Sequence, residues 1–136
     1  MDRGVAGLSW LVDVARRARL SNTDTLDLSG VSSAADAWDR VAEHCGITVD
    51  DLAHEVSEVL RLPLARLERR DVHVDRLVPD KLARRFQVVA LRESERQIVV
   101  ATADPLNDEV EAALGFATGR APLFEIATPA AIATAL

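Results

Sequence analysis

Apolar positions in the first part of the chain follow a helical pattern. Leu8, Leu11, Val12 and Ala15 recur at i, i+3, i+4 and i+7. This spacing predicts a first helix that buries one face. A stretch rich in Ser, Thr, Asp and Gly follows at residues 21–33 and predicts a loop.

Two more helices are predicted after this loop, and both carry start and stop signals. Ser33 can cap the second helix, and Gly46 suits its end. Thr48 and Asp51 have the spacing of a cap at the start of the third helix. The apolar stripes of these helices are predicted to be buried, and they consist of Trp38, Val41, Ala42 and Cys45 and of Leu52, Val56, Val59 and Leu60.

The second half of the chain combines a basic segment with strands and helices. Runs of β-branched and other apolar residues predict strands at residues 86–92, 97–103 and 122–128. Because the run "QIVVATA" does not alternate, Val99 and Val100 are both expected to be largely buried. We therefore predict an α+β fold with a helical N-terminal subdomain at 1–60, a basic connector at 61–78, and a small mixed subdomain of about three strands and flanking helices at 79–136.

Composition narrows the classes of function. The chain has 136 residues, of which 49% are hydrophobic, enough for one compact core or for two small subdomains. Its formal net charge of −6 argues against a protein that binds nucleic acid phosphates over its whole surface. Cys45 is the single cysteine, which excludes an intramolecular disulfide. The sequence lacks a secretory signal and a long apolar run, so we expect a cytoplasmic location without membrane insertion.

Motifs of enzymatic chemistry are absent from the sequence. It contains neither a G-x-x-x-x-G-K-[ST] phosphate loop nor a G-x-G-x-x-G turn. His44, His54 and His73 fall in different predicted elements, without the spacing of a helical metal pair. Asp104 and Pro105 are predicted to form a turn, because no reacting partner for Asp104 is evident. We predict that the chain is not an enzyme and holds neither a metal nor a cofactor.

Arginines gather near the end of the first predicted helix and again in the basic connector. Either group could bind a partner, because a guanidinium pairs with carboxylates while its stem covers apolar surface. The alternative for the first group is a favourable effect on the helix C-terminus. The alternative for the second is that Arg61 and Arg66 pair internally with carboxylates such as Glu58 or Glu68. The first group is Arg16, Arg17 and Arg19, and the second is Arg61, Arg66, Arg69 and Arg70.

A DNA-binding alternative is suggested by residues 46–62, which resemble the capped second helix of a helix-turn-helix protein. The exposed face of that helix would be acidic, and its carboxylates would repel phosphates in the groove. Its polar residues are Asp50, Asp51, His54, Glu55 and Glu58.

The order of elements from residue 38 onward resembles a known family. Its most specific pieces are "GITVDDLAHEVSEVLRLPLARL" and, after it, "RLVPDKLARRFQVVALRESERQIVVATADPLNDEVEAALGFATGR". Together they resemble the N-terminal domain of bacterial type II secretion and type IV pilus assembly ATPases, the GspE N-terminal domain, whose cyclic di-GMP-binding branch is called MshEN. This resemblance implies a non-catalytic adaptor or regulatory domain. Its implied partner is an inner-membrane platform protein of a secretion or pilus machine, or the rest of its own ATPase chain.

The same resemblance implies an alternative, a sensor that binds cyclic di-GMP through a diverged motif. That branch uses motifs of the type R-L-G-x-x-L-x-x-x-G followed by L-x-x-A-L-x-x-Q. Asp39 stands where the second motif has its first glycine, and it would bring bulk and negative charge toward a phosphodiester. The positions that this alternative assigns to the ligand are Asp39, Gly46, Leu52, Leu62 and Pro63.

Overall fold

The computed structural model describes residues 8–136, apart from the side chain of Val72. The first seven residues of the predicted N-terminal subdomain lie outside this description. The chain divides into two compact units, Met1–Leu62 and Pro63–Leu136. Each unit has its own secondary structure, and together they make the predicted α+β fold, which is thereby confirmed.

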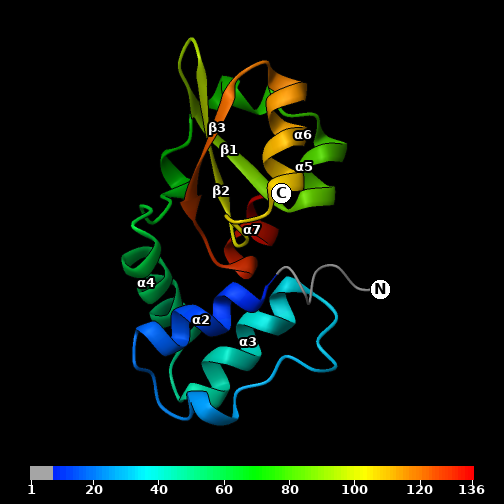
Figure 1. The fold of residues 1–136 in the computed structure, drawn as a ribbon. Helices are drawn as coiled ribbons and strands as arrows, with labels where there is room; N and C mark the ends of the chain where they lie inside the picture. Colours follow the sequence, from blue (N-terminus) through cyan, green and yellow to red (C-terminus); the bar gives the residue numbers. More distant parts are fainter. Residues whose placement is uncertain (1–7) are drawn as a thin grey trace. The chain divides into compact units, whose positions relative to one another are not determined.

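The described part of the N-terminal unit is helical (Figure 1). Its helices are α2 at Ser9–Arg17, α3 at Ala34–Cys45 and α4 at Val49–Leu60, and a short 3₁₀ turn at Thr23–Thr25 lies in the loop between α2 and α3. All three helices pack against one another. The predicted stripes supply most of this core, and its fully buried members include Leu11, Trp38, Val41, Leu52 and Val56.

The ends of α3 and α4 follow the predicted caps. The backbone N–H of Asp36 donates to Ser33 Oγ at 3.1 Å, and α3 ends at Gly46, whose φ of 73° is left-handed. Thr48 and Asp51 exchange side-chain and backbone hydrogen bonds in a capping box. These local signals therefore fix where both helices begin.

The C-terminal unit is a three-stranded sheet with helices packed on it. Strands β1 (Val88–Glu93), β2 (Gln97–Thr102) and β3 (Ala121–Ile126) lie in that order, with β1 antiparallel and β3 parallel to β2. The helices are α5 (Asp80–Phe86), α6 (Asp108–Thr118) and α7 (Pro129–Ala135), and 3₁₀ turns occupy Leu67–Arg69 and Val72–Arg76. Helices α5 and α6 lie on the same side of the sheet (Figure 1).

The two faces of β2 are buried to different degrees. Ile98 and Val100 are fully buried against Val110 and Leu114 of α6. Val99 points to the other face and is only partly buried. Its cross-strand partner there is Leu123, which is itself 45% exposed. The expected burial is therefore correct for Val100 and weaker than expected for Val99.

The basic segment after Leu62 is part of the C-terminal unit from Pro63 onward. The backbone N–H of Ala65 donates to Ile126 O, and the N–H of Ile126 donates to Pro63 O, each at 2.8 Å. These bonds form a short parallel bridge between Leu64 and Ile126, the last residue of β3. Segment 63–65 is thereby fixed to the sheet edge.

The Asp104–Pro105 corner is a structural turn that leads into α6. The N–H of Asp104 donates to Thr102 Oγ1 at 3.0 Å, and Asn107 Nδ2 donates to the Asp104 carboxylate at 3.2 Å. Asn107 in turn accepts from the N–H of Glu109 and caps α6. The carboxylate of Asp104 therefore helps to position the cap.

Candidate functional site

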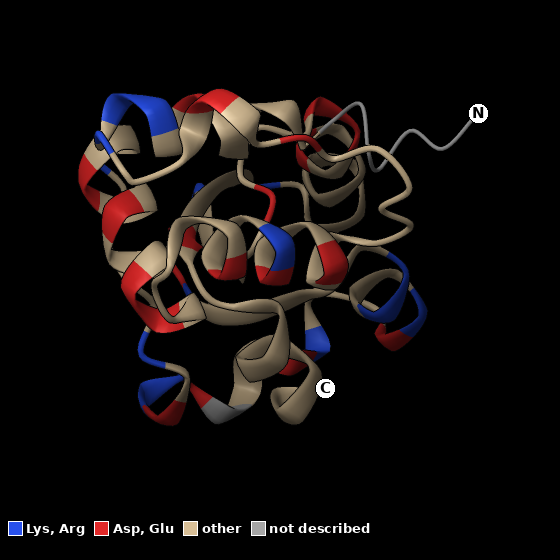
Figure 2. Ribbon diagram, turned by 90° about the horizontal axis from the view of Figure 1, so that it is seen from below, with Lys and Arg blue, Asp and Glu red and all other residues tan. Residues whose placement is uncertain are grey.

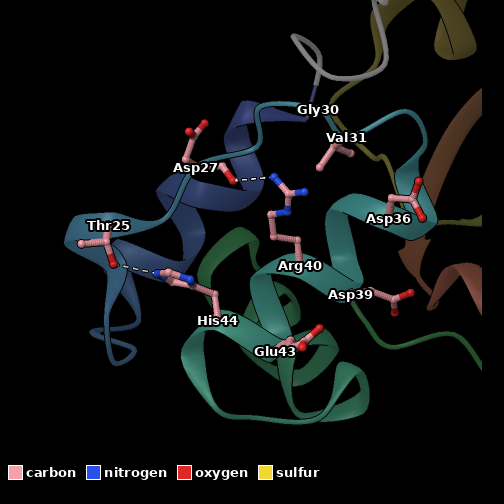
Figure 3. A pocket seen from close by; sticks show the side chains of 9 residues that line it. All are labelled: Thr25, Asp27, Gly30, Val31, Asp36, Asp39, Arg40, Glu43 and His44. Carbon is pink, nitrogen blue, oxygen red and sulfur yellow. Dashed lines mark hydrogen bonds between the residues drawn. The ribbon is translucent and has the colours of Figure 1, made fainter.

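The N-terminal unit contains an open pocket of about 710 Å³ between α3 and the loop before it. Figure 3 shows the side chains that line it, with the loop on one side and the polar face of α3 on the other. The lining residues are Thr25, Asp27, Gly30, Val31, Asp36, Asp39, Arg40, Glu43 and His44.

Arg40 anchors the loop from the middle of α3. Its Nη1 donates to the backbone oxygens of Asp27 at 3.2 Å and Ser29 at 2.5 Å. The carboxylate of Asp27 also accepts hydrogen bonds from Oγ and N of Ser29, at 2.6 Å and 2.8 Å. These bonds from Ser29, with a smaller effect of the Arg40 charge, lower the pKa of Asp27.

His44 lies one helical turn after Arg40 and holds an earlier part of the same loop. Its Nε2 is 3.0 Å from Asn22 O and 2.8 Å from Thr25 Oγ1, and Asn22 Nδ2 donates to His44 O at 3.3 Å. The i, i+4 spacing of Arg40 and His44 places both side chains on one face of α3. The i, i+4 spacing of Arg40 and His44 can be read from the sequence. The groups of the loop that they contact cannot.

The pocket is acidic. Carboxylates of Asp27, Asp36, Asp39 and Glu43 line it, against the single guanidinium of Arg40. Figure 2 shows acidic positions along the helices of the described chain, with a few basic positions between them. Arg40 uses Nη1 for the two backbone oxygens of the loop, and its single positive charge is opposed by four carboxylates. The arrangement disfavours a phosphodiester.

The structure places the predicted ligand positions in different surroundings. Asp39 lines the acidic pocket, whereas Leu52 is fully buried in the helical core and Gly46 ends α3. Leu62 is partly buried, and its backbone oxygen accepts from Ser57 Oγ at 2.6 Å. Pro63 is exposed and belongs to the other unit.

The basic residues of the connector differ in their environments. Arg66 and Arg69 are exposed, whereas Arg70 is partly buried and donates to Ala135 O at 3.4 Å. Arg61 ends α4 with a φ of 57° and belongs to the N-terminal unit. Among residues 8–136, no ion pair is found for Arg61, Arg66 or Arg69. The proposed internal pairing with Glu58 or Glu68 is therefore not formed.

The arginines at the end of α2 are also exposed. Arg16 lies 3.9 Å from Asp13, which is a weak surface pair. Arg19 has a φ of 58° just beyond the helix, and the last turn of α2 contains Arg16 and Arg17. The positive charges of this group lie at the C-terminus of α2, where the helix macrodipole favours cations.

Other features of the described residues concern DNA binding, metal binding and membrane-spanning helices. The exposed positions of α4 include Asp50, Asp51 and Glu58, so the face available to DNA is acidic. Within the described residues, no group of three or more His, Cys, Asp and Glu side chains could hold a metal ion. None of the helices between residues 8 and 136 is both long and apolar enough to cross a membrane.

Comparison with protein families decides the relationship. The sequence model of the MshEN domain family matches residues 60–136, which is more than half of the chain. The chain belongs to the MshEN domain family. The resemblance seen in the sequence is thereby confirmed. No curated protein matches the chain.

Solved structures share the fold of this MshEN domain. A structure of MshE with cdg, the cyclic dinucleotide cyclic di-GMP, has a TM-score of 0.68 at 19% identity, covering 91% of this chain and 94% of that one. A structure of the N-terminal domain of XpsE has a TM-score of 0.64 at 21% identity, covering 95% and 92%. A second crystal form of that domain gives 0.55 at 21% identity, covering 93% and 92%. At these identities the likeness establishes the fold.

Proposed function

We propose that this MshEN domain is a non-catalytic, cytoplasmic adaptor of a type II secretion or type IV pilus machine. It docks to the cytoplasmic part of an inner-membrane platform protein, or to the rest of its own ATPase chain. The docking surface is the basic segment of the C-terminal unit, centred on Arg66 and Arg69. The observation that carries this proposal is that both side chains are exposed and form no ion pair with another described residue.

The chemistry of this segment supports a protein partner. Arg66 and Arg69 flank Leu67, which is only partly buried, and Leu64 nearby is also partly exposed. Arginine beside apolar surface is typical of interfaces, because its planar fork pairs with carboxylates while its stem covers carbon. We therefore expect an acidic partner surface with a small apolar centre.

A charge-reversal experiment tests this proposal. The double variant Arg66→Glu/Arg69→Glu should bind the cytoplasmic domain of the platform protein at least about tenfold more weakly in biolayer interferometry, because it removes attraction and adds repulsion. Arg70 is left unchanged because its bond to Ala135 supports the fold. The matched control is Arg76→Glu/Lys81→Glu, which makes the same change in charge at two exposed positions that form no ion pair with another described residue.

If the parent and both double variants bind the cytoplasmic domain of the platform protein equally well, the basic segment is not the docking surface. In that case the group Arg16, Arg17 and Arg19 on α2 is the next surface to reverse. Failure of the parent domain to bind any platform protein, or the catalytic part of its own ATPase, would overturn the adaptor function itself.

The alternative function is cyclic di-GMP sensing, which the shared fold with MshE supports. The acidic pocket opposes it, because Asp39 lies in the lining and Arg40 is engaged by the loop. Isothermal titration should therefore give no heat for the parent chain. Asp39→Gly restores the glycine of the motif and tests whether this carboxylate is the obstacle. Binding by the parent at micromolar concentration or below would favour the sensor function.

A further inference from the structure

An open groove of about 760 Å³ lies on the C-terminal unit beside the basic segment. The 3₁₀ turn at Leu67–Arg69 and the residue after it contribute one wall, and α7 contributes the other. Leu67 lines the groove, and the proposed docking residues Arg66 and Arg69 flank Leu67 in the sequence. The groove is therefore continuous with the proposed docking surface.

The apolar part of the groove is formed by Leu67 and by α7. Leu67 is only partly buried, and Ala131 and Ala135 line the wall that α7 contributes, one helical turn apart. Because an alanine side chain ends at Cβ, these two residues leave room in the groove for a side chain from another molecule. Such a side chain would bury the surface of Leu67 that is now in contact with water.

Arg70 lines the same groove and is partly buried. Its Nη1 donates to Ala135 O at 3.4 Å, which is long for a hydrogen bond. Among the residues that the structure describes, its guanidinium forms no ion pair. A guanidinium has five N–H donors, and two of them can bind one carboxylate in parallel. Arg70 is therefore able to receive a carboxylate from a partner without breaking an internal ion pair.

The charge around the groove is positive. Two carboxylates line it, those of Glu68 and Asp75, and the guanidiniums of Arg66, Arg69 and Arg70 stand against them in the same short segment. The chain as a whole has a formal net charge of −6, so the local excess is opposite in sign to the rest of the molecule. An acidic segment is therefore attracted to this place, whereas a basic segment is repelled.

We infer that the groove is the recognition site of the docking surface, and that it binds a segment of the platform protein with an apolar side chain next to a carboxylate. The apolar side chain enters between Leu67 and Ala131, and the carboxylate binds Arg70 through two parallel hydrogen bonds. Arg66 and Arg69, which are more exposed, attract the acidic segment as it approaches. This inference rests on the proposed docking function and adds the chemistry of the segment that is bound.

Filling the groove tests the apolar contact. Ala131→Trp should raise the dissociation constant for the cytoplasmic domain of the platform protein at least about tenfold in biolayer interferometry, because the indole takes the space of the partner's anchoring side chain. The matched control is Ala130→Trp, which makes the same substitution at the preceding residue of α7. Ala130 is exposed and does not line the groove, so this variant should bind like the parent.

Replacing arginine by lysine tests the carboxylate contact. Arg70→Lys keeps the positive charge but loses the planar pair of donors, so the dissociation constant should rise at least about fivefold. The matched control is Arg69→Lys, because an exposed arginine that acts through its charge can be replaced by lysine with little effect on binding. Circular dichroism verifies that each variant is folded, and if Ala131→Trp does not fold, the two lysine variants decide the outcome.

Two results would overturn the groove and leave the docking function in place, provided that Arg66→Glu/Arg69→Glu still weakens binding. One is equal binding by folded Ala131→Trp and Ala130→Trp, and the other is equal binding by Arg70→Lys and Arg69→Lys. A parent chain that binds no platform protein would overturn the docking function and the groove together. A loss of binding in Ala131→Trp that is confined to the catalytic part of its own ATPase would overturn the assignment of the groove to the platform protein.

Discussion

Substitution of Trp38 by alanine tests the helical core most directly. Trp38 lies on α3 and is 0% exposed, with Val41, Ala42 and Cys45 on the same buried side of the helix. The indole is therefore surrounded by the packed helices and is unavailable for stacking on a ligand. Its removal should destabilise the N-terminal unit strongly and leave the C-terminal unit little affected.

The expected magnitude follows from the buried area. A fully buried tryptophan removes about 150–250 Å² from water, which corresponds to about 4–6 kcal/mol at 25 cal/mol per Å². Alanine retains its own Cβ, which lowers this value, whereas a cavity that does not fully relax adds to the loss. We expect a loss of about 3–5 kcal/mol, the usual range for a buried tryptophan replaced by alanine. Domains have a free energy of unfolding of about 5–15 kcal/mol. The variant should therefore be close to the limit of folding.

Urea unfolding followed by circular dichroism and fluorescence measures this loss. In Trp38→Ala the remaining tryptophan, Trp10, is 8% exposed in the same unit and reports its unfolding. The matched control is Phe116→Ala, which removes an aromatic ring that is 94% exposed and should change stability by less than about 0.5 kcal/mol. An unchanged urea midpoint for Trp38→Ala would refute the buried position of the indole.

Three further predictions concern single groups. Thr48→Ala should cost about 1 kcal/mol, because it removes the N-cap of α4, whereas Thr48→Ser should retain most of the stability in the same urea assay. Burial raises the pKa of the Cys45 thiol, so a thiol reagent such as DTNB should react with it only after unfolding, and rapid reaction of the native chain would contradict this. Hydrogen bonds from Ser29 lower the pKa of Asp27. The ionised carboxylate therefore stabilises the fold at pH values above 3.8, the ordinary aspartate pKa, and this stabilisation is lost as the pH falls below it. Parent and Asp27→Asn should therefore differ in urea midpoint at pH 7, and this difference should shrink as the pH falls below 3.8. A difference that stays the same over this pH range would exclude the role of Asp27.

Local signals in the sequence determined the helices, the strands and the family. The stripe that contains Trp38, and the caps at Ser33 and Thr48, depend only on residues three or four positions apart. Interactions of this range are visible in a linear sequence. Local rules for helix ends do not cover α4. It ends at Arg61, which has a left-handed φ of 57°, and no glycine marks this position in the sequence.

The tertiary structure alone decided which polar groups meet. Arg40 and His44 hold a loop that precedes them by many residues, and Arg92 on β1 pairs with the buried Glu125 on β3. The same holds for the sheet edge, where Ala65 bonds to Ile126. Such contacts depend on how distant segments pack after the chain has closed its loops, and no local pattern of residues encodes that geometry.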